Sequence, residues 1–252
     1  LMVVGFAGMI NETLDRIIIS YVYTDVQEGL RATGIYGANY KLSVLMLLFI
    51  QAFRYAAEPF FFNHAKDNDK RHIYATVMNY FTLVCLVLFL TVILYIDVFK
   101  HFINNRYWEG LHVVPVLLLA NMFLGMYYNL SIWYKLSDNT NKGAMISTTG
   151  AVITILANII LVPLFGYTGS AWATLICYVS MAVICYVMGA KYYPIPYQVG
   201  RLLGYIGFAL VLFLGSTYLP IPDGILKYSL NALLLLLFIG VTVVSERKNT
   251  IA

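Results

Sequence analysis

The sequence predicts an all-α, polytopic helical membrane protein with about eight transmembrane helices. Of its 252 residues, 61% are hydrophobic and 11% are charged, whereas soluble domains have about 45–50% and about 25%. A soluble core cannot hide that much apolar surface, while eight spans of about 20 residues would occupy roughly two-thirds of the chain. The net charge of +4 does not indicate nucleic acid as a partner, because membrane proteins carry excess Lys and Arg in their cytoplasmic loops.

Eight apolar segments of helical length alternate with polar connections. They lack the alternation of apolar and polar residues that membrane β-strands show, so a barrel is excluded. The second segment would be about 43 Å long at 1.5 Å per residue, and it must therefore tilt or project past the bilayer near Pro59. The segments are 1–22, 34–62, 73–96, 113–134, 143–163, 168–189, 199–219 and 225–245.

Lys and Arg are divided unequally between alternate loops. Nine lie in one set of loops and the C-terminal tail, and four lie in the opposite set. This bias predicts that the nine-residue set and the C-terminus are cytoplasmic. The first set is Lys66, Lys70, Arg71, Lys135, Lys142, Lys191, Arg201, Arg247 and Lys248, and the second is Arg31, Lys100, Arg106 and Lys227.

Ionisable residues inside the first two segments are the candidates for a substrate cavity, because a charge at membrane depth costs several kcal/mol unless it is paired or hydrated. If these segments form a hairpin that turns near residue 28, Asp15 and Lys41 lie level, about 10–12 Å below the outer end. An Asp15–Lys41 pair facing a cavity is therefore predicted. The alternatives are a Lys41 that snorkels outward and a pair that only holds the helices together. The six candidates are Glu12, Asp15, Arg16, Lys41, Arg54 and Glu58.

Arg54 is the best single candidate for a pyrophosphate contact. Its guanidinium is always charged and has the geometry to bind phosphate through two N–H groups at once. A local salt bridge to Glu58, one turn later on the same helix, is the alternative.

No pattern of catalytic or metal-binding residues is present, so we expect neither an enzyme nor a cofactor. The three cysteines lie in apolar runs without a Cys/His metal spacing, and the four histidines lie in polar loops or at their edges. There is no nucleophile elbow, HExxH motif or glycine-rich phosphate loop. A membrane polymerase or ligase would show a large polar loop, whereas the longest connection, 97–112, has only Asp97 and Glu109 as acidic residues.

Small residues at spacings of four predict close packing between the fifth and sixth segments. The fifth segment offers Gly143, Ser147 and Ala151, and the sixth offers Gly169, Ala173 and Cys177.

The junction between these segments resembles a family signature. The run Asn158-Ile-Ile-Leu-Val-Pro163-Leu-Phe-Gly166-Tyr-Thr-Gly169-Ser-Ala171-Trp-Ala173-Thr174 is similar to the helix, short turn and helix of oligosaccharide flippases, with Ser170 in place of an alanine. The segments 33–41 and 52–62 look like the start and end of the eighth helix of that family, and Asn11 and Asp15 stand where its seventh helix carries polar residues. The chain thus resembles the polysaccharide-type (Wzx-like) branch of the multidrug/oligosaccharidyl-lipid/polysaccharide exporter superfamily.

The resemblance implies that the chain is the C-terminal part of a two-lobe flippase. Residues 1–189 would form the second six-helix lobe, and 190–252 would form two additional helices with a short cytoplasmic tail. The start at Leu1, inside an apolar run that fits no signal peptide, leads us to expect that a first lobe precedes it. An alternating-access cavity needs both lobes, so this chain alone would not transport.

The family moves undecaprenyl-pyrophosphate-linked oligosaccharides across the bacterial inner membrane for surface polysaccharides such as lipopolysaccharide. The implied partners are that lipid-linked substrate, membrane lipids, the first lobe and the polysaccharide polymerase machinery, without nucleic acid. Two alternatives stay open, namely a multidrug exporter of the same superfamily and a polymerase or ligase of the same pathway. A membrane scaffold whose charges serve only as structural pairs is a further possibility.

Overall fold

The computed structural model describes residues 14–23, 25–64, 69–137, 139–218 and 224–251. Within these ranges the chain forms helices and short connections, without a β-strand. Seven of the described helices are long and apolar enough to cross a membrane. The all-α, multi-pass prediction is therefore confirmed. Of the first predicted segment, only the part from residue 14 onward lies within the described residues, where 14–22 are helical.

The long helices agree with the predicted segments at most of their boundaries, and short helical turns connect some of them. The long helices are α2 (Val26–Asn63), α3 (Lys70–Leu94), α5 (Val114–Leu130), α7 (Thr140–Phe165), α8 (Tyr167–Tyr192), α9 (Val199–Tyr218) and α10 (Ile225–Ile251). The short ones are α4 (Ile96–Phe99), η2 (Lys100–Phe102), η3 (Asn105–Val113) and α6 (Ile132–Leu136).

The predicted start of the second segment was wrong, because α2 begins at Val26 instead of residue 34. Asp25 is its N-cap, and the Asp25 side chain accepts a hydrogen bond from the Gln27 backbone N–H at 2.9 Å. A capping carboxylate stabilises a helix start even where the first turns are polar. Hydropathy alone assigned these polar turns to a loop. As a result, α2 has 38 residues and is about 57 Å long.

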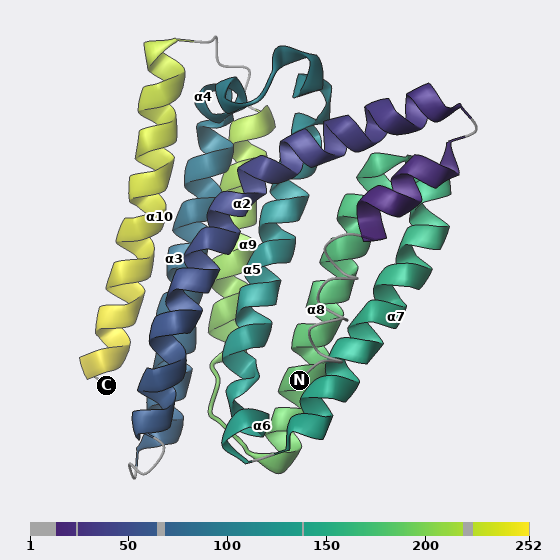
Figure 1. Ribbon diagram of the computed structural model, residues 1–252. Coiled ribbons are helices and arrows are strands. Elements are labelled where there is room, and N and C mark those ends of the chain that lie inside the picture. The colour runs from purple at the N-terminus through teal and green to yellow at the C-terminus, as the bar shows by residue number, and fades with distance from the viewer. Residues whose placement is uncertain (1–13, 24, 65–68, 138, 219–223, 252) are drawn as a thin grey trace.

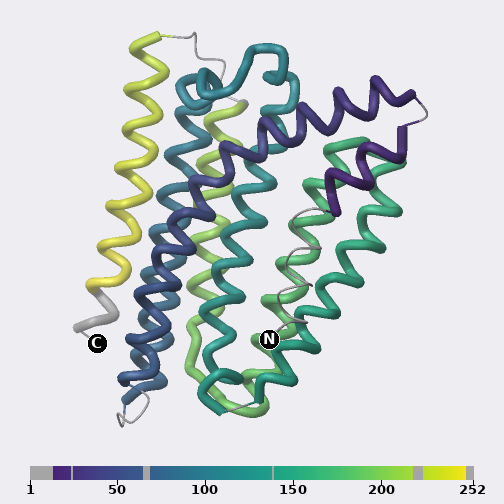
Figure 2. Tube along the Cα trace, in the orientation of Figure 1, coloured from purple at the N-terminus to yellow at the C-terminus, as the bar shows by residue number. Residues whose placement is uncertain are grey.

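The helices begin alternately at the two ends of the bundle, as the predicted sidedness requires. Helices η3, α8 and α10 begin at one end, and α3, α7 and α9 begin at the other (Figures 1 and 2). The basic loops that the charge bias places in the cytoplasm precede α3, α7 and α9 in the sequence. Below, these two ends are called the outer and the inner end, after that prediction.

Helix α5 lies at the centre of the bundle and packs against α2, α3 and α8. Figure 1 shows that α2 bends partway along its length. Its first half crosses the outer end towards α7 and α8, and its second half runs beside α3. This bend places the two halves of α2 in different surroundings. The expectation that so long a helix tilts, or projects past the bilayer near Pro59, stays a prediction.

Helices α7 and α8 form a tight antiparallel hairpin, as the small residues predicted. Gly166 forms the turn with φ +56°, a left-handed backbone conformation that favours glycine. A Cβ atom on Gly169 would collide with the backbone carbonyl of Leu161 on α7. Farther along the hairpin, the Cys177 thiol donates to the Gly150 carbonyl at 3.3 Å.

Two of the predicted contact residues of the fifth segment face other helices. Gly143 packs on the ring of Tyr134 in α6, and the Ser147 hydroxyl lies 3.3 Å from the Tyr127 hydroxyl in α5. The small-residue stripe of α7 therefore contacts α5 and α6 near the inner end, as well as α8. A spacing of four indicates close approach without identifying the partner helix.

Candidate functional site

Asp15 lies at a buried polar centre between helix 14–22, α2, α7 and α8. Its side chain is 2% exposed. Oδ2 accepts hydrogen bonds from the Tyr36 hydroxyl at 2.7 Å and the Thr174 hydroxyl at 2.9 Å, and Oδ1 accepts one from the Asn158 amide at 3.1 Å. Ser170 in turn donates to Asn158 Oδ1 at 2.8 Å. We call these five residues the Asp15 centre.

The α7–α8 hairpin supplies three of these five residues through its geometry. Asn158 lies on α7, and Ser170 and Thr174 lie one helical turn apart on α8, so both α8 hydroxyls point the same way. The tight turn at Gly166 and the close approach at Gly169 bring the two helices near enough for their polar groups to meet. Buried polar groups require such partners, because an unpaired donor or acceptor is costly.

The predicted Asp15–Lys41 pair was wrong. Lys41 is exposed, and no ion pair joins it to a carboxylate within the described ranges. The hairpin turns near residues 23–25, and this shifts the residue level with Asp15 to about 33 on α2. Tyr36, one turn farther along α2, takes the position that Lys41 was expected to fill.

The other candidates on the first segment have separate surroundings. The Arg16 guanidinium lies 5.7 Å from the centroid of the Tyr40 ring and is exposed, so it does not pair with Asp15. Glu12 and Asn11 lie outside the described residues. The assignment of Glu12 to the cavity therefore stays a prediction.

A second polar centre joins Arg54 and Glu58 of α2 to Lys135 of α6. The Lys135 ammonium lies 2.6 Å from Glu58 Oε1, whereas Arg54 Nε lies 4.0 Å from the same oxygen. The side chains of Arg54, Glu58 and Lys135 are 33%, 41% and 29% exposed. We call these three residues the Arg54 centre. It lies towards the inner end, since Lys135 directly precedes the α6–α7 junction.

The Arg54 centre contains more positive than negative charge. Lys135 forms the shorter contact with the single carboxylate, and Arg54 makes no hydrogen bond to another described residue, although its guanidinium lies 5.0 Å from the centroid of the Tyr128 ring. The predicted local Arg54–Glu58 salt bridge is thus present only as a long contact. Half-exposed cations of this kind remain able to bind an external anion.

The sequence places Lys135 among the loop charges, so the predicted site does not include it. Its position directly after an apolar segment, at the same predicted end of the membrane as Glu58, was the signal that could have identified it. The space enclosed beside the Arg54 centre is only about 10 Å³, roughly enough for one water. A larger anion must therefore contact the cations from their exposed side.

The outer end has its own ion pairs, which join separate segments of the chain. Asp97 accepts from the Lys100 ammonium at 2.7 Å and from the Lys227 ammonium at 2.6 Å. Hydrogen bonds from these two cations lower the pKa of the Asp97 carboxyl below its ordinary value of 3.8. Arg31 pairs with Glu109 at 3.0 Å. These pairs connect α10 to α4 and α2 to η3.

No group of three or more His, Cys, Asp or Glu side chains is arranged to hold a metal ion in the described part of the chain. The three cysteines are buried and free.

Fold and polar centres together define a helical multi-pass membrane protein. The chain matches no family model and no curated protein in sequence.

Proposed function

We propose that this chain takes part in moving polyprenyl-pyrophosphate-linked oligosaccharides across the bacterial inner membrane, with its C-terminus in the cytoplasm. The observation that supports this proposal is the Arg54 centre, in which two cations share one carboxylate at the edge of a multi-pass bundle. The similarity of the segment 158–174 to the flippase signature points to the same cargo.

Pyrophosphate is the chemical group that fits the Arg54 centre. It is a multiply charged anion with several oxygens, and Arg54 offers a planar fork of N–H donors while Lys135 offers a compact positive charge. Partial burial strengthens the attraction, since the effective dielectric near a protein surface is well below that of water. The acidic Glu58 limits the affinity, and a carrier benefits from this because it must also release its cargo.

Translocation of this kind breaks and forms no covalent bond, so it needs no catalytic residue. In our proposal, the second half of α2 presents Arg54 to the cargo at the inner end. The Asp15 centre holds the first half of α2 against the α7–α8 hairpin. A cationic site disfavours cationic drugs as cargo, because like charges repel in a medium of low dielectric.

The test is the leaflet location of lipid-linked repeat units in cells that lack the gene. A membrane-impermeant glycan label distinguishes units on the outer face from those held inside. Complete units that accumulate on the cytoplasmic face support translocation. Single units that accumulate on the outer face indicate a polymerase or ligase, and the absence of accumulation favours drug export.

Variants in the chromosomal gene then locate the site. Arg54→Ala and Lys135→Gln should abolish export while membrane abundance stays near normal. Lys142→Gln is the matched control, since this lysine lies at the same end of the bundle but contacts the Tyr192 ring instead. Lys41→Ala tests whether the exposed lysine on the same helix belongs to the path. Loss of abundance in step with loss of export would contradict the assignment of the site.

A further inference from the structure

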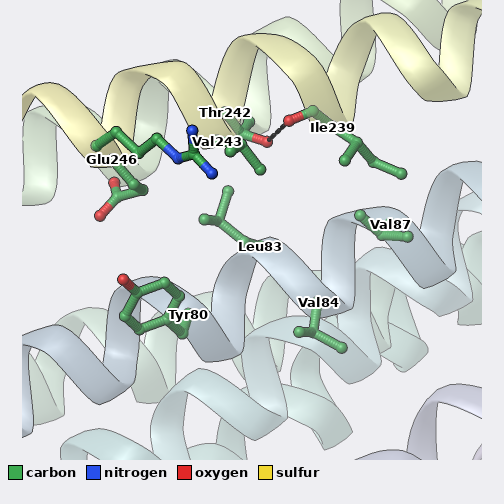
Figure 3. A pocket seen from close by; sticks show the side chains of 9 residues that line it. Tyr80, Leu83, Val84, Val87, Ile239, Thr242, Val243 and Glu246 are labelled. Carbon is green, nitrogen blue, oxygen red and sulfur yellow. Dashed lines mark hydrogen bonds between the residues drawn. The ribbon is translucent and has the colours of Figure 1, made fainter.

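A groove of about 590 Å³ separates α3 from α10 (Figure 3). This volume is in the range of pockets that hold a small molecule, about 300–1,000 Å³. The groove lies on the side of the bundle opposite the α7–α8 hairpin (Figure 1). The apolar side chains along it are Leu83, Val84 and Val87 of α3 and Ile239 and Val243 of α10.

The polar residues of the groove gather at one end. Helices α3 and α10 are antiparallel, so Tyr80 near the start of α3 lies level with Glu246 and Arg247 near the end of α10. The remaining polar residue, Thr242, donates to the backbone carbonyl of Phe238 at 2.9 Å, and this leaves the middle of the groove effectively apolar. The groove is therefore amphipathic along its length.

The charge at the polar end is positive. Glu246 accepts a hydrogen bond from the Tyr205 hydroxyl at 2.7 Å and lies 3.6 Å from Arg201 Nη1, so its negative charge is balanced within the protein. Arg247 also lines the groove, and no carboxylate among the described residues forms an ion pair with it. An anionic group at this end would complement Arg247.

The depth of this end matches the headgroup region of a bilayer. The apolar run of α10 gives way to the charged residues Glu246, Arg247 and Lys248, and the same end of the bundle carries the basic loops predicted to be cytoplasmic. From Arg247 to Ile239 the groove extends about 12 Å along α10. A ligand with one anionic head at the interface and an apolar chain pointing into the bilayer fits both features.

We propose that the groove between α3 and α10 binds an anionic glycerophospholipid of the surrounding bilayer. Its acyl chain lies between Leu83, Val87 and Val243, and its phosphate binds Arg247. The lipid fills the contact between α10 and the rest of the bundle. This proposal is independent of the translocation proposed above, because its occupant is a bilayer lipid and not the cargo.

The experiment is native mass spectrometry of the purified chain with equal amounts of phosphatidylglycerol and phosphatidylcholine that carry identical acyl chains. We expect at least a fivefold preference for one bound phosphatidylglycerol. Arg247→Gln should remove the headgroup preference, and Arg247→Lys should retain it. Val243→Trp, which fills the groove without changing its charge, should reduce bound lipid of both kinds at least fivefold.

The control is Val211→Trp on α9, because Val211 is equally apolar and 65% exposed but does not line the groove. Equal retention of the two lipids by the unaltered chain would overturn the proposal and indicate only surrounding bilayer lipid. An equal loss of lipid in the Val211→Trp variant would overturn it as well. Displacement of phosphatidylglycerol by an equimolar polyprenyl phosphate would assign the groove to the cargo chain and overturn the choice of a phospholipid.

Discussion

The Asp15 centre and the Arg54 centre both include residues of the long helix α2 and differ in almost every physical property. Asp15 is 2% exposed and accepts hydrogen bonds from three neutral donors. Arg54 is about one-third exposed and shares one carboxylate with a lysine. A buried group that is fully hydrogen-bonded holds helices together, whereas a half-exposed excess of charge stays available to a ligand. An intramembrane charge is therefore functional or structural according to its surroundings, and its depth alone does not decide between the two.

The largest effect should follow from replacing Asp15. Asp15→Ala leaves the Tyr36, Thr174 and Asn158 donors without their acceptor, and each buried unpaired group costs about 1–3 kcal/mol. We expect the free energy of unfolding in detergent to fall by about 2–4 kcal/mol. Asp15→Asn keeps one acceptor oxygen and should cost less. An unfolding free energy of Asp15→Ala within about 0.5 kcal/mol of the original would show that the Asp15 centre does not hold the helices together.

A second test separates α7 from α8 without changing a polar group. In Gly169→Ala the new Cβ collides with the Leu161 carbonyl, and such overpacking costs about 1–3 kcal/mol. Gly207→Ala is the matched control, since nothing lies within 4 Å of a Cβ at that position, and it should be neutral or slightly stabilising. Thermal unfolding measures both variants. Equal melting temperatures would contradict the close approach that assembles the Asp15 centre.

A smaller effect is expected at the Arg54 centre, where Glu58→Gln removes the shared carboxylate. Stability should change by less than about 1 kcal/mol, because half-exposed ion pairs contribute little. Affinity for undecaprenyl pyrophosphate should rise about threefold, and the gain should shrink with added salt. Titration of the purified protein with undecaprenyl pyrophosphate measures this affinity and its dependence on salt. Weaker binding in this variant would mean that the carboxylate positions the cations instead of competing with the ligand.

The smallest effect concerns Asp97, a carboxylate paired with two cations at the outer end. Its pKa is lowered in the folded chain from the ordinary value of 3.8, so its contribution to stability is complete above that ordinary value. That contribution declines below about pH 4 and is lost as the pH falls through the folded pKa. Asp97→Asn should therefore be less stable than the original at pH 6, and the difference should shrink as the pH falls below about 4. A difference that is constant with pH would exclude the ion pairs as its cause.

The sequence predicted the helices well because apolar runs of helical length have few alternative structures in a membrane. The start of α2 could not be read from hydropathy, because the Asp25 cap stabilises polar turns that resemble a loop. That error moved the residue predicted to lie level with Asp15 from about residue 33 to Lys41. The residue predicted to lie level with Asp15 thus depends on where the hairpin turns. The turn is the least apolar part of the hairpin, so hydropathy locates it poorly.

The candidate site was predicted in part. Arg54 and Glu58 share a centre as expected, whereas Lys135 completes it from a segment that is distant in sequence. The signature residues Asn158 and Thr174 were recognised as a motif, but their common contact with Asp15 depends on how three separate elements pack. Periodicity reports which residues share a helix face, and contacts between helices require their relative rotation and register as well.

The central claim is that the Arg54 centre binds the pyrophosphate while the Asp15 centre only holds the helices together. The most direct test measures binding of undecaprenyl pyrophosphate to the purified protein, with Arg54→Gln and Asp15→Asn compared at equal folded fraction. The account predicts a loss of at least about tenfold, or ~1.4 kcal/mol, for Arg54→Gln and affinity unchanged from the original for Asp15→Asn. Unchanged binding in Arg54→Gln, or an equal loss in Asp15→Asn, would contradict it.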